Sequence, residues 1–273
     1  MRTLLGKVVI VTGAASGIGR GLAHRFAAAG GRIAIADLDA VGAQRVANEI
    51  VGLGGQAGAF GVDVTSATSA RELRDAVLAR MGAIDVLVNN AGIVHGGAFL
   101  DVPLEQHLAT FRVNVEGLVT ITHAVLPVLL TRPEAHVVTI ASASSFVGLP
   151  FGTTYGASKW AALGFTESLR IELRQLGHTH VGLTAVCPSY VGTGMFSGVQ
   201  PPRLTRWLTP DRVADLTVRA VLANKATVLT PWLVKLTPLL RGVLPRRVFD
   251  VVAAAFGVNT SMASWRGRSR ERP

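Results

Sequence analysis

The chain has 273 residues, of which 49% are hydrophobic and 16% are charged, and its formal net charge at pH 7 is +10. Its single cysteine excludes an intrachain disulfide, which fits a reducing compartment, so we expect a cytoplasmic protein. The seven histidines lack metal-ligand spacing, and the basic residues form no nucleic-acid recognition motif. We therefore expect no metal site and no nucleic-acid partner.

Apolar runs rich in β-branched residues alternate with helical patterns along the chain. The runs are residues 7–12, 32–36, 57–62, 84–88, 136–141, 181–187 and 226–229. This alternation predicts an α/β fold: a single Rossmann-type, doubly wound parallel sheet of about seven strands with helices on both faces. We expect residues 1–230 to form this domain and residues 231–273 to form a C-terminal extension.

A glycine-rich turn, Thr12-Gly13-Ala14-Ala15-Ser16-Gly17-Ile18-Gly19, follows the first run and leads into a helical pattern. Glycine allows positive φ and lets the backbone close on a pyrophosphate, while the start of the helix presents free N–H groups to that anion. In a chain with 30 glycines an ordinary tight turn remains an alternative. The position between a strand and a helix favours a dinucleotide site.

The second run ends at Asp37, whose carboxylate could accept hydrogen bonds from the ribose hydroxyls of adenosine and would repel a 2′-phosphate. Leu38 follows, where a basic residue would favour the phosphorylated cofactor. Alternatively, Asp37 could cap the next helix, although Asp39 is better placed to do so. These residues favour NAD over NADP.

Ligands of a doubly wound sheet bind at the carboxyl ends of the strands. Five residues fall at these predicted ends: Gly13, Asp37, Asn89, Ser142 and Pro188. Just beyond, Tyr155 and Lys159 are four residues apart in a helix predicted from Thr154 to about Gln175, which places them on one face. A nearby ammonium would favour the phenolate and make Tyr155 useful for proton transfer. The alternative is an ordinary pair on a solvated helix face.

Together these features resemble the short-chain dehydrogenase/reductase family, over about residues 7 to 230. The resemblance implies that Ser142, Tyr155, Lys159 and Asn114 are catalytic, with Asn114 holding a water in the proton relay. It implies a cofactor site at Thr12, Gly13, Ser16, Gly17, Ile18, Gly19, Asp37, Asp63, Val64, Asn90, Ala91, Gly92, Tyr155, Lys159, Pro188, Val191 and Thr193. Ser189 replaces the family's usual glycine, which calls the backbone freedom of that turn into question.

The implied activity is hydride transfer between a nicotinamide cofactor and an alcohol/ketone pair. Tyr155 would act as general acid or base, Ser142 would steady the substrate oxygen, and Lys159 would lower the pKa of the phenol and bind the nicotinamide ribose. Ser144 and Ser145 compete for the role of Ser142. A nucleotide-binding scaffold or regulatory member of the same family is the alternative function.

The substrate pocket is expected from residues 94–99, 143–151 and 194–208. These segments carry few charges and contain Phe99, Phe146, Leu149, Phe151, Met195, Phe196 and Trp207. Such side chains predict an apolar alcohol or ketone, unless they only pack the loops against the core.

The helical pattern from Val113 to Leu129 is apolar around most of its circumference, which is more than one sheet face can cover. We therefore expect a homodimer or homotetramer. The uncharged run at residues 117–131 is too short for a transmembrane helix and contains Pro127, so no such helix is expected.

The C-terminal extension carries most of the excess positive charge. Residues 200–273 contain 13 basic and 4 acidic side chains, and the cations alternate with bulky apolar residues. This pattern suits peripheral contact with an anionic membrane. The alternative is a lid over the substrate pocket with solvated arginines, since Pro231, Pro238 and Pro245 would break any long helix.

Overall fold

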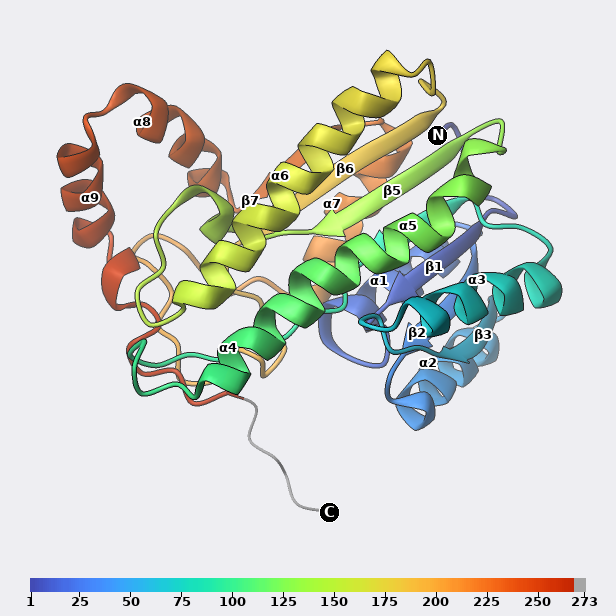
Figure 1. Cartoon of the computed structure of the whole chain (residues 1–273), viewed down its shortest axis with the longest axis horizontal. Helices are drawn as coiled ribbons and strands as arrows, with labels where there is room; N and C mark the ends of the chain where they lie inside the picture. Colours follow the sequence, from blue (N-terminus) through green and yellow to red (C-terminus); the bar gives the residue numbers. More distant parts are fainter. Residues whose placement is uncertain (268–273) are drawn as a thin grey trace.

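The computed structural model describes residues 1–267. Its centre is a seven-stranded parallel sheet with the strand order β3-β2-β1-β4-β5-β6-β7 (Figure 1). The strands are β1 Val8–Thr12, β2 Arg32–Asp37, β3 Gln56–Gly61, β4 Val86–Asn89, β5 Ala135–Ile140, β6 Val181–Pro188 and β7 Thr227–Thr230. The predicted doubly wound parallel sheet is thereby confirmed, and the predicted strand limits agree to within two residues.

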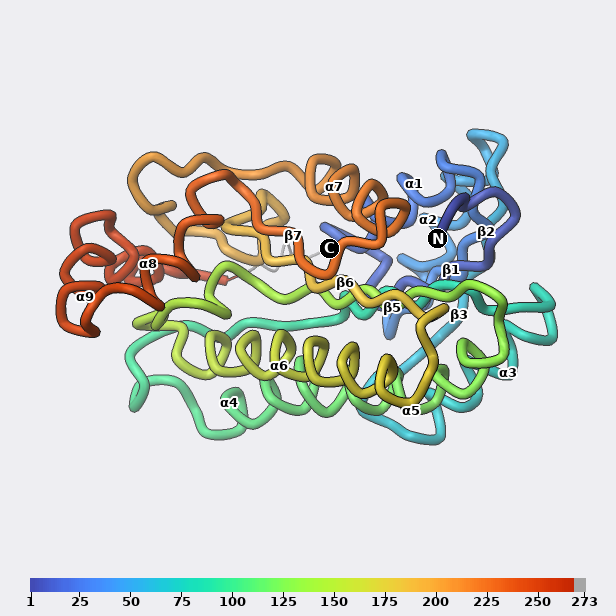
Figure 2. The backbone as a smooth tube through the Cα atoms, turned by 90° about the horizontal axis from the view of Figure 1, so that it is seen from above, coloured from blue at the N-terminus to red at the C-terminus, as the bar shows by residue number. Residues whose placement is uncertain are grey.

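Helices cover both faces of this sheet (Figure 2). One face packs against α1 Gly17–Ala28, α2 Ala40–Gly52 and α7 Pro210–Leu222. The other packs against α3 Ala67–Met81, α5 Gly117–Leu130 and α6 Thr153–Gln175. In β1, Val9 and Val11 belong to the first core and Val8 and Ile10 to the second, because successive side chains of a strand point to opposite faces. This two-sided burial explains why β1 and β4 are apolar along nearly their whole length.

A single helical run joins α4 Leu104–Phe111 to α5 through a π-helical segment, η1 Arg112–Glu116. The run Leu104–Leu130 has 27 residues and is long and apolar enough to cross a membrane by length and composition. The helix is therefore longer than the uncharged run at residues 117–131 on which the prediction was based, because α4 and η1, which carry Glu105, Arg112 and Glu116, continue it toward the N-terminus. Within the run, Ile121, Val125 and Leu129 are buried in the core of the sheet, as in an ordinary core helix.

The C-terminal extension forms short helices that lie beyond the carboxyl ends of the strands, at the end of the molecule where α8 and α9 are seen in Figures 1 and 2. They are η3 Trp232–Leu236, α8 Thr237–Val243, α9 Arg246–Ala255 and η4 Val258–Thr260. Pro231 and Pro245 stand directly before η3 and α9 and divide the extension as expected, whereas Pro238 lies in the first turn of α8, where a helix tolerates proline. The extension therefore faces the edge of the sheet at which a ligand would bind.

Candidate active site

The glycine-rich turn between β1 and α1 is tightly constrained. Gly13 has φ +64°, and a Cβ there would lie 2.8 Å from Ala91 Cα. A Cβ on Gly19 would lie 2.1 Å from the carbonyl oxygen of Gly13. Gly17 has φ +57° and stands opposite the Thr193 side chain. Side chains at these positions would fill the space the backbone needs, so the turn keeps its N–H groups open to an anion.

Thr12 and Asn90 join this turn to the end of β4. The Thr12 hydroxyl accepts hydrogen bonds from the backbone N–H groups of Asn90 (3.0 Å) and Ala91 (3.1 Å). In return, the Asn90 amide donates to the carbonyl oxygens of Thr12 (2.9 Å) and Gly13 (3.0 Å). These contacts show that both residues shape the turn, whatever else they bind.

Asp37 lies at the carboxyl end of β2 beside the turn. Its Oδ2 accepts a hydrogen bond from Ala15 N at 2.8 Å, and its Oδ1 accepts one from Asp39 N at 3.0 Å. Asp39 is the residue that caps α2, through a 2.9 Å bond from Gly42 N. The capping alternative for Asp37 is therefore excluded, and its carboxylate lines the pocket beside the exposed Leu38.

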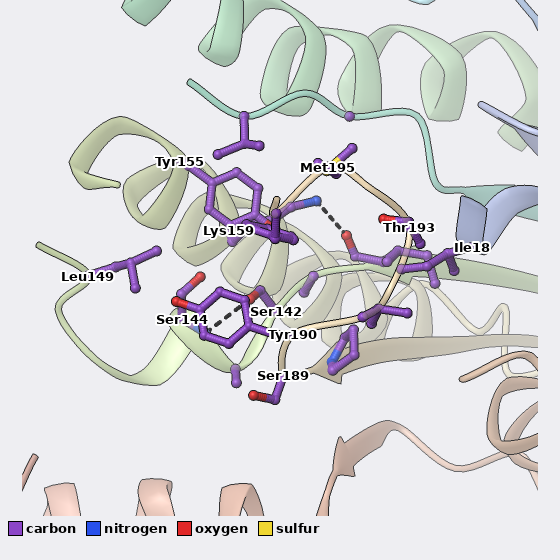
Figure 3. A pocket seen from close by; sticks show the side chains of 18 of the residues that line it. Ile18, Ser142, Ser144, Leu149, Tyr155, Lys159, Ser189, Tyr190, Thr193 and Met195 are labelled. Carbon is purple, nitrogen blue, oxygen red and sulfur yellow. Dashed lines mark hydrogen bonds between the residues drawn. The ribbon is translucent and has the colours of Figure 1, made fainter. Parts of the chain in front are cut away.

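Ser142, Tyr155 and Lys159 come together where β5 ends and α6 begins (Figure 3). Tyr155 and Lys159 are both buried, and Lys159 Nζ lies 5.7 Å from the centroid of the Tyr155 ring. Burial raises the pKa of the Tyr155 phenol, and a hydrogen bond with Ser142 partly opposes this rise. Contrary to the predicted effect of Lys159, the phenol is thus held in its protonated form.

Lys159 is itself affected by its surroundings. Burial lowers the pKa of its ammonium to about 8, and Nζ donates a 2.8 Å hydrogen bond to the carbonyl oxygen of Ile140. The cation therefore persists at neutral pH and is lost as the pH rises through about 8.

Cys187 lies nearby and is fully buried. Burial raises the pKa of its thiol to about 12, so Cys187 is a packing residue rather than a nucleophile.

Asn114 lies in η1, behind the Tyr155 and Lys159 pair. Its amide nitrogen donates to Ile93 O (3.0 Å) and Ser158 Oγ (2.9 Å), and its Oδ1 accepts from Ile93 N (2.8 Å). A separate cavity of about 10 Å³ is lined by Asn114, Lys159 and the buried hydroxyl of Thr139. That volume is close to what one water molecule needs, so the geometry is compatible with a water between these groups.

The neighbouring serines have different surroundings. Ser145 Oγ donates a 2.6 Å hydrogen bond to the carbonyl oxygen of Lys159, which occupies it structurally. Ser144 N donates to Ser142 Oγ at 3.1 Å, while the buried Ser144 hydroxyl has no partner among residues 1–267. Ser142, unlike Ser145, therefore has its hydroxyl on the pocket side, and Ser144 adds a second hydroxyl there.

A cavity of about 850 Å³ contains most of the predicted site residues. Those that line it are Gly13, Ser16, Gly17, Ile18, Asp37, Asp63, Val64, Asn90, Ala91, Gly92, Ser142, Tyr155, Lys159, Pro188, Val191 and Thr193. Thr12, Gly19 and Asn114 lie behind its surface. Ser189 adopts no positive φ, so the turn after β6 does not require the glycine that Ser189 replaces.

The substrate side of this cavity differs from the prediction in several residues. Leu149, Met195 and Phe196 line it as expected. Phe99, Phe151 and Trp207 are exposed, and Phe146 packs beside Leu163, so these four side chains do not line the cavity. The prediction failed for them because an aromatic residue in a loop can point to either side, and periodicity does not determine which.

Tyr190, which the sequence analysis did not assign, and the extension, for which a lid over the pocket was the alternative role, form another part of the wall. The Tyr190 hydroxyl lies 2.8 Å from Ser261 Oγ, and since Ser261 donates to Val258 O, the phenol is the donor. The indole N–H of Trp265 donates to Met195 O at 3.1 Å. Extension residues that line the cavity include Leu233, Leu236, Leu240, Phe249, Val252, Phe256, Val258 and Ser261. The extension therefore closes the cavity from the side opposite the glycine turn.

The cavity has the features that a dinucleotide requires. The glycine turn leaves a cradle that a Cβ would fill, the N-terminus of α1 points into it, and Asp37 stands at the far end. Tyr155, Ser142 and Lys159 lie toward the extension, next to apolar walls. The residues present thus fit a nicotinamide dinucleotide, with space for an apolar molecule beside the phenol.

Comparison with known proteins agrees with this geometry. A family model described as short chain dehydrogenase matches residues 7–203. The chain is 33% identical over 251 residues to 17-beta-hydroxysteroid dehydrogenase 13 of Rattus norvegicus, covering 92% of this chain and 83% of that protein. It is 32% identical to estradiol 17-beta-dehydrogenase 11 of Mus musculus, covering 92% and 84%.

Solved structures give the same result for the fold. A short chain dehydrogenase/reductase from Burkholderia phymatum, in complex with NAD, is similar with a TM-score of 0.81 and 29% identity over 89% of this chain and 95% of that one. The 3-ketoacyl-(acyl-carrier-protein) reductase from Brucella melitensis, complexed with NADH, is similar with a TM-score of 0.73 and 29% identity over 83% and 97%.

Proposed function

Because the chain belongs to the short-chain dehydrogenase family, an oxidoreductase family, we propose that it interconverts an apolar alcohol and its ketone. The observation that carries the proposal is the grouping of partly buried Ser142 with buried Tyr155 and Lys159 at the junction between the glycine cradle and an apolar wall. A bound nicotinamide dinucleotide would accept the hydride in its oxidised form and supply it in its reduced form.

Tyr155 would move the proton at the substrate oxygen. Because burial raises the pKa of its phenol, it is protonated at neutral pH and suited to donate to a developing alkoxide during ketone reduction. Ser142 would hold that oxygen through its hydroxyl. Lys159, a cation below about pH 8, would bind the nicotinamide ribose and stabilise the phenolate formed when Tyr155 loses its proton. Asn114 would connect Lys159 to a water in the small cavity behind it.

We propose NAD rather than NADP as the cofactor. Asp37 faces the cavity and its charge would oppose a 2′-phosphate, while Leu38 offers no compensating cation. The apolar substrate class is supported by Val94, Leu149 and Phe196 in the wall and by the extension. Relatives are named for hydroxysteroids, so this class is a reasonable first choice for testing.

The test is a panel of hydroxysteroids, fatty alcohols and ketones, followed by the absorbance of NADH and NADPH. We expect turnover with NADH, and we expect alcohol oxidation to accelerate as the pH rises toward 8, because oxidation needs the phenolate of Tyr155 whereas reduction needs the phenol. Above about pH 8 this gain should level off, because Lys159 loses the charge that stabilises the phenolate. Cofactor binding without turnover on any member of the panel would instead support the scaffold or regulatory role.

We also propose that the protein is a cytoplasmic homodimer or homotetramer. Leu104, Leu108 and Val119 are exposed along the run from α4 to α5, which leaves apolar surface for a symmetric partner. Light scattering at micromolar concentration should give at least twice the mass of one chain, and a monomer would contradict this.

A further inference from the structure

The extension has apolar side chains on two sides of its short helices. One set, which includes Leu240, Phe249 and Val252, lines the cavity. A second set does not line it and is 47% to 72% exposed; this outer set is Trp232, Leu239, Val243, Val248 and Val251. An element that is apolar on both sides needs apolar cover on both. The outer set lacks that cover in the single chain.

The outer set follows helical spacing. Leu239 and Val243 are four residues apart in α8, and Val248 and Val251 are three apart in α9, so each pair lies on one side of its helix. Figures 1 and 2 show α8 and α9 at one end of the molecule, away from the helices that cover the sheet. The outer set therefore offers a terminal surface of the molecule to a partner.

The charge around this surface is positive. Residues 231–267 contain five basic side chains and one acidic side chain, Asp250. Lys235, Arg246 and Arg247 are exposed, and no ion pair within residues 1–267 includes them. Arg241 differs, because its guanidinium lies 4.1 Å from the centroid of the Trp160 ring and donates to Phe146 O at 2.9 Å. Arg241 anchors the extension and Arg266 lines the cavity, so Lys235, Arg246 and Arg247 are the three cations that remain available.

We propose that the outer set and these three cations dock the protein on an anionic lipid surface. Apolar side chains would enter the headgroup region while the cations meet lipid phosphates and carboxylates. A second copy of the chain fits less well, since a symmetric contact through this end would bring like charges together. Docking would place the substrate-side wall of the cavity against the bilayer. That consequence rests on the proposed apolar substrate, whereas the docking itself does not.

The test is flotation of the full chain with vesicles of phosphatidylcholine, with or without about a third phosphatidylserine, at low and high salt. We expect binding only to the anionic vesicles at low salt. Arg246→Gln with Arg247→Gln should weaken partitioning roughly 25-fold, because each cation contributes about a fivefold factor. Leu239→Glu with Val251→Glu should abolish it. Point substitutions are preferable to removing residues 231–273, since the extension forms part of the cavity wall.

The control for the loss of charge is Arg112→Gln with Arg174→Gln. The control for the loss of exposed apolar surface is Val41→Glu with Leu53→Glu. All four residues are exposed and lie outside the extension. Binding of NADH, followed by its fluorescence, should be retained in every variant, which separates this test from that of the proposed function. Equal partitioning of all variants, or equal binding to neutral vesicles, would overturn the proposal. Self-association that the extension variants abolish, without vesicle binding, would assign the surface to a second copy and would also overturn it.

Discussion

On the cofactor side of the cavity, the lining residues lie within a few positions of a strand end, as Gly13 follows β1, Asp37 ends β2 and Asn90 follows β4. On the substrate side, the lining comes from long connections and from the extension, which meet through contacts such as that between Met195 and Trp265. The first side is therefore fixed by local backbone geometry, and the second by contacts between segments distant in sequence. We expect mutations to have different consequences on the two sides.

Tyr155 lies where the two sides meet, and its removal should have the largest effect. Tyr155→Phe deletes the hydroxyl but keeps the ring, which contacts Phe196 edge to face. We expect at least about a hundredfold loss of turnover, the usual contribution of an acid or base. NADH affinity, measured by fluorescence titration, should change little. Undiminished turnover would remove Tyr155 from the mechanism.

Gly19→Ala tests the cofactor side. The new Cβ would meet the Gly13 carbonyl at 2.1 Å and the Asn90 amide at 2.5 Å, so the turn must shift. We expect a loss of about 1 to 3 kcal/mol in the free energy of unfolding, as for other overpacked sites, together with weaker NADH binding. Gly52→Ala is the control, since nothing lies within 4 Å of its Cβ position at the end of α2. Equal effects of the two substitutions would mean that the turn is not tightly constrained.

Cofactor choice should depend on Asp37 and Leu38. Asp37→Ala with Leu38→Arg removes a repelling carboxylate and adds a guanidinium, so the ratio of kcat/KM for NADP over NAD should rise about tenfold or more. Asp37→Asn with Leu38→Arg is the matched variant. It removes the charge of Asp37, but the amide oxygen can still accept the hydrogen bond from Ala15 N. A wild-type protein that already works better with NADPH would contradict the role of Asp37.

The smallest effect on activity is expected on the substrate side. Ser261→Ala leaves the buried Tyr190 hydroxyl without its acceptor, which should cost about 1 to 3 kcal/mol of folding stability in urea titrations and raise KM for an apolar substrate a few-fold. Tyr190→Phe should cost less, because Ser261 keeps its bond to Val258 O. The double variant should then be no less stable than Ser261→Ala alone. Strict additivity would show that the two hydroxyls are not coupled.

The contrast between the cofactor side and the substrate side also explains which parts of the fold and of the site could be predicted from the sequence. The strands and the glycine turn were predictable because hydrophobic runs and glycine positions are local signals. Asp37 could be separated from a capping role because Asp39 stood nearby with the better position. The orientation of Phe99 and Trp207 was not predictable, because it depends on contacts with segments far away in the chain. The rise in the pKa of Tyr155 was not predictable either, since it follows from burial of the phenol, which residue spacing does not show.

The π-helical segment η1 has a consequence for how this region can vary. In an α-helix each residue turns the chain by about 100°, whereas a π turn contains more residues per turn and changes the direction of everything that follows. Asn114 lies in η1, so its contacts with Ile93 and Ser158 depend on the number of residues between α4 and α5. Deleting one residue here would rotate Asn114 away from the site or turn the core-facing side of α5 toward solvent. The length of this joint is therefore more tightly constrained than its exposed side chains, Arg112 and Glu116.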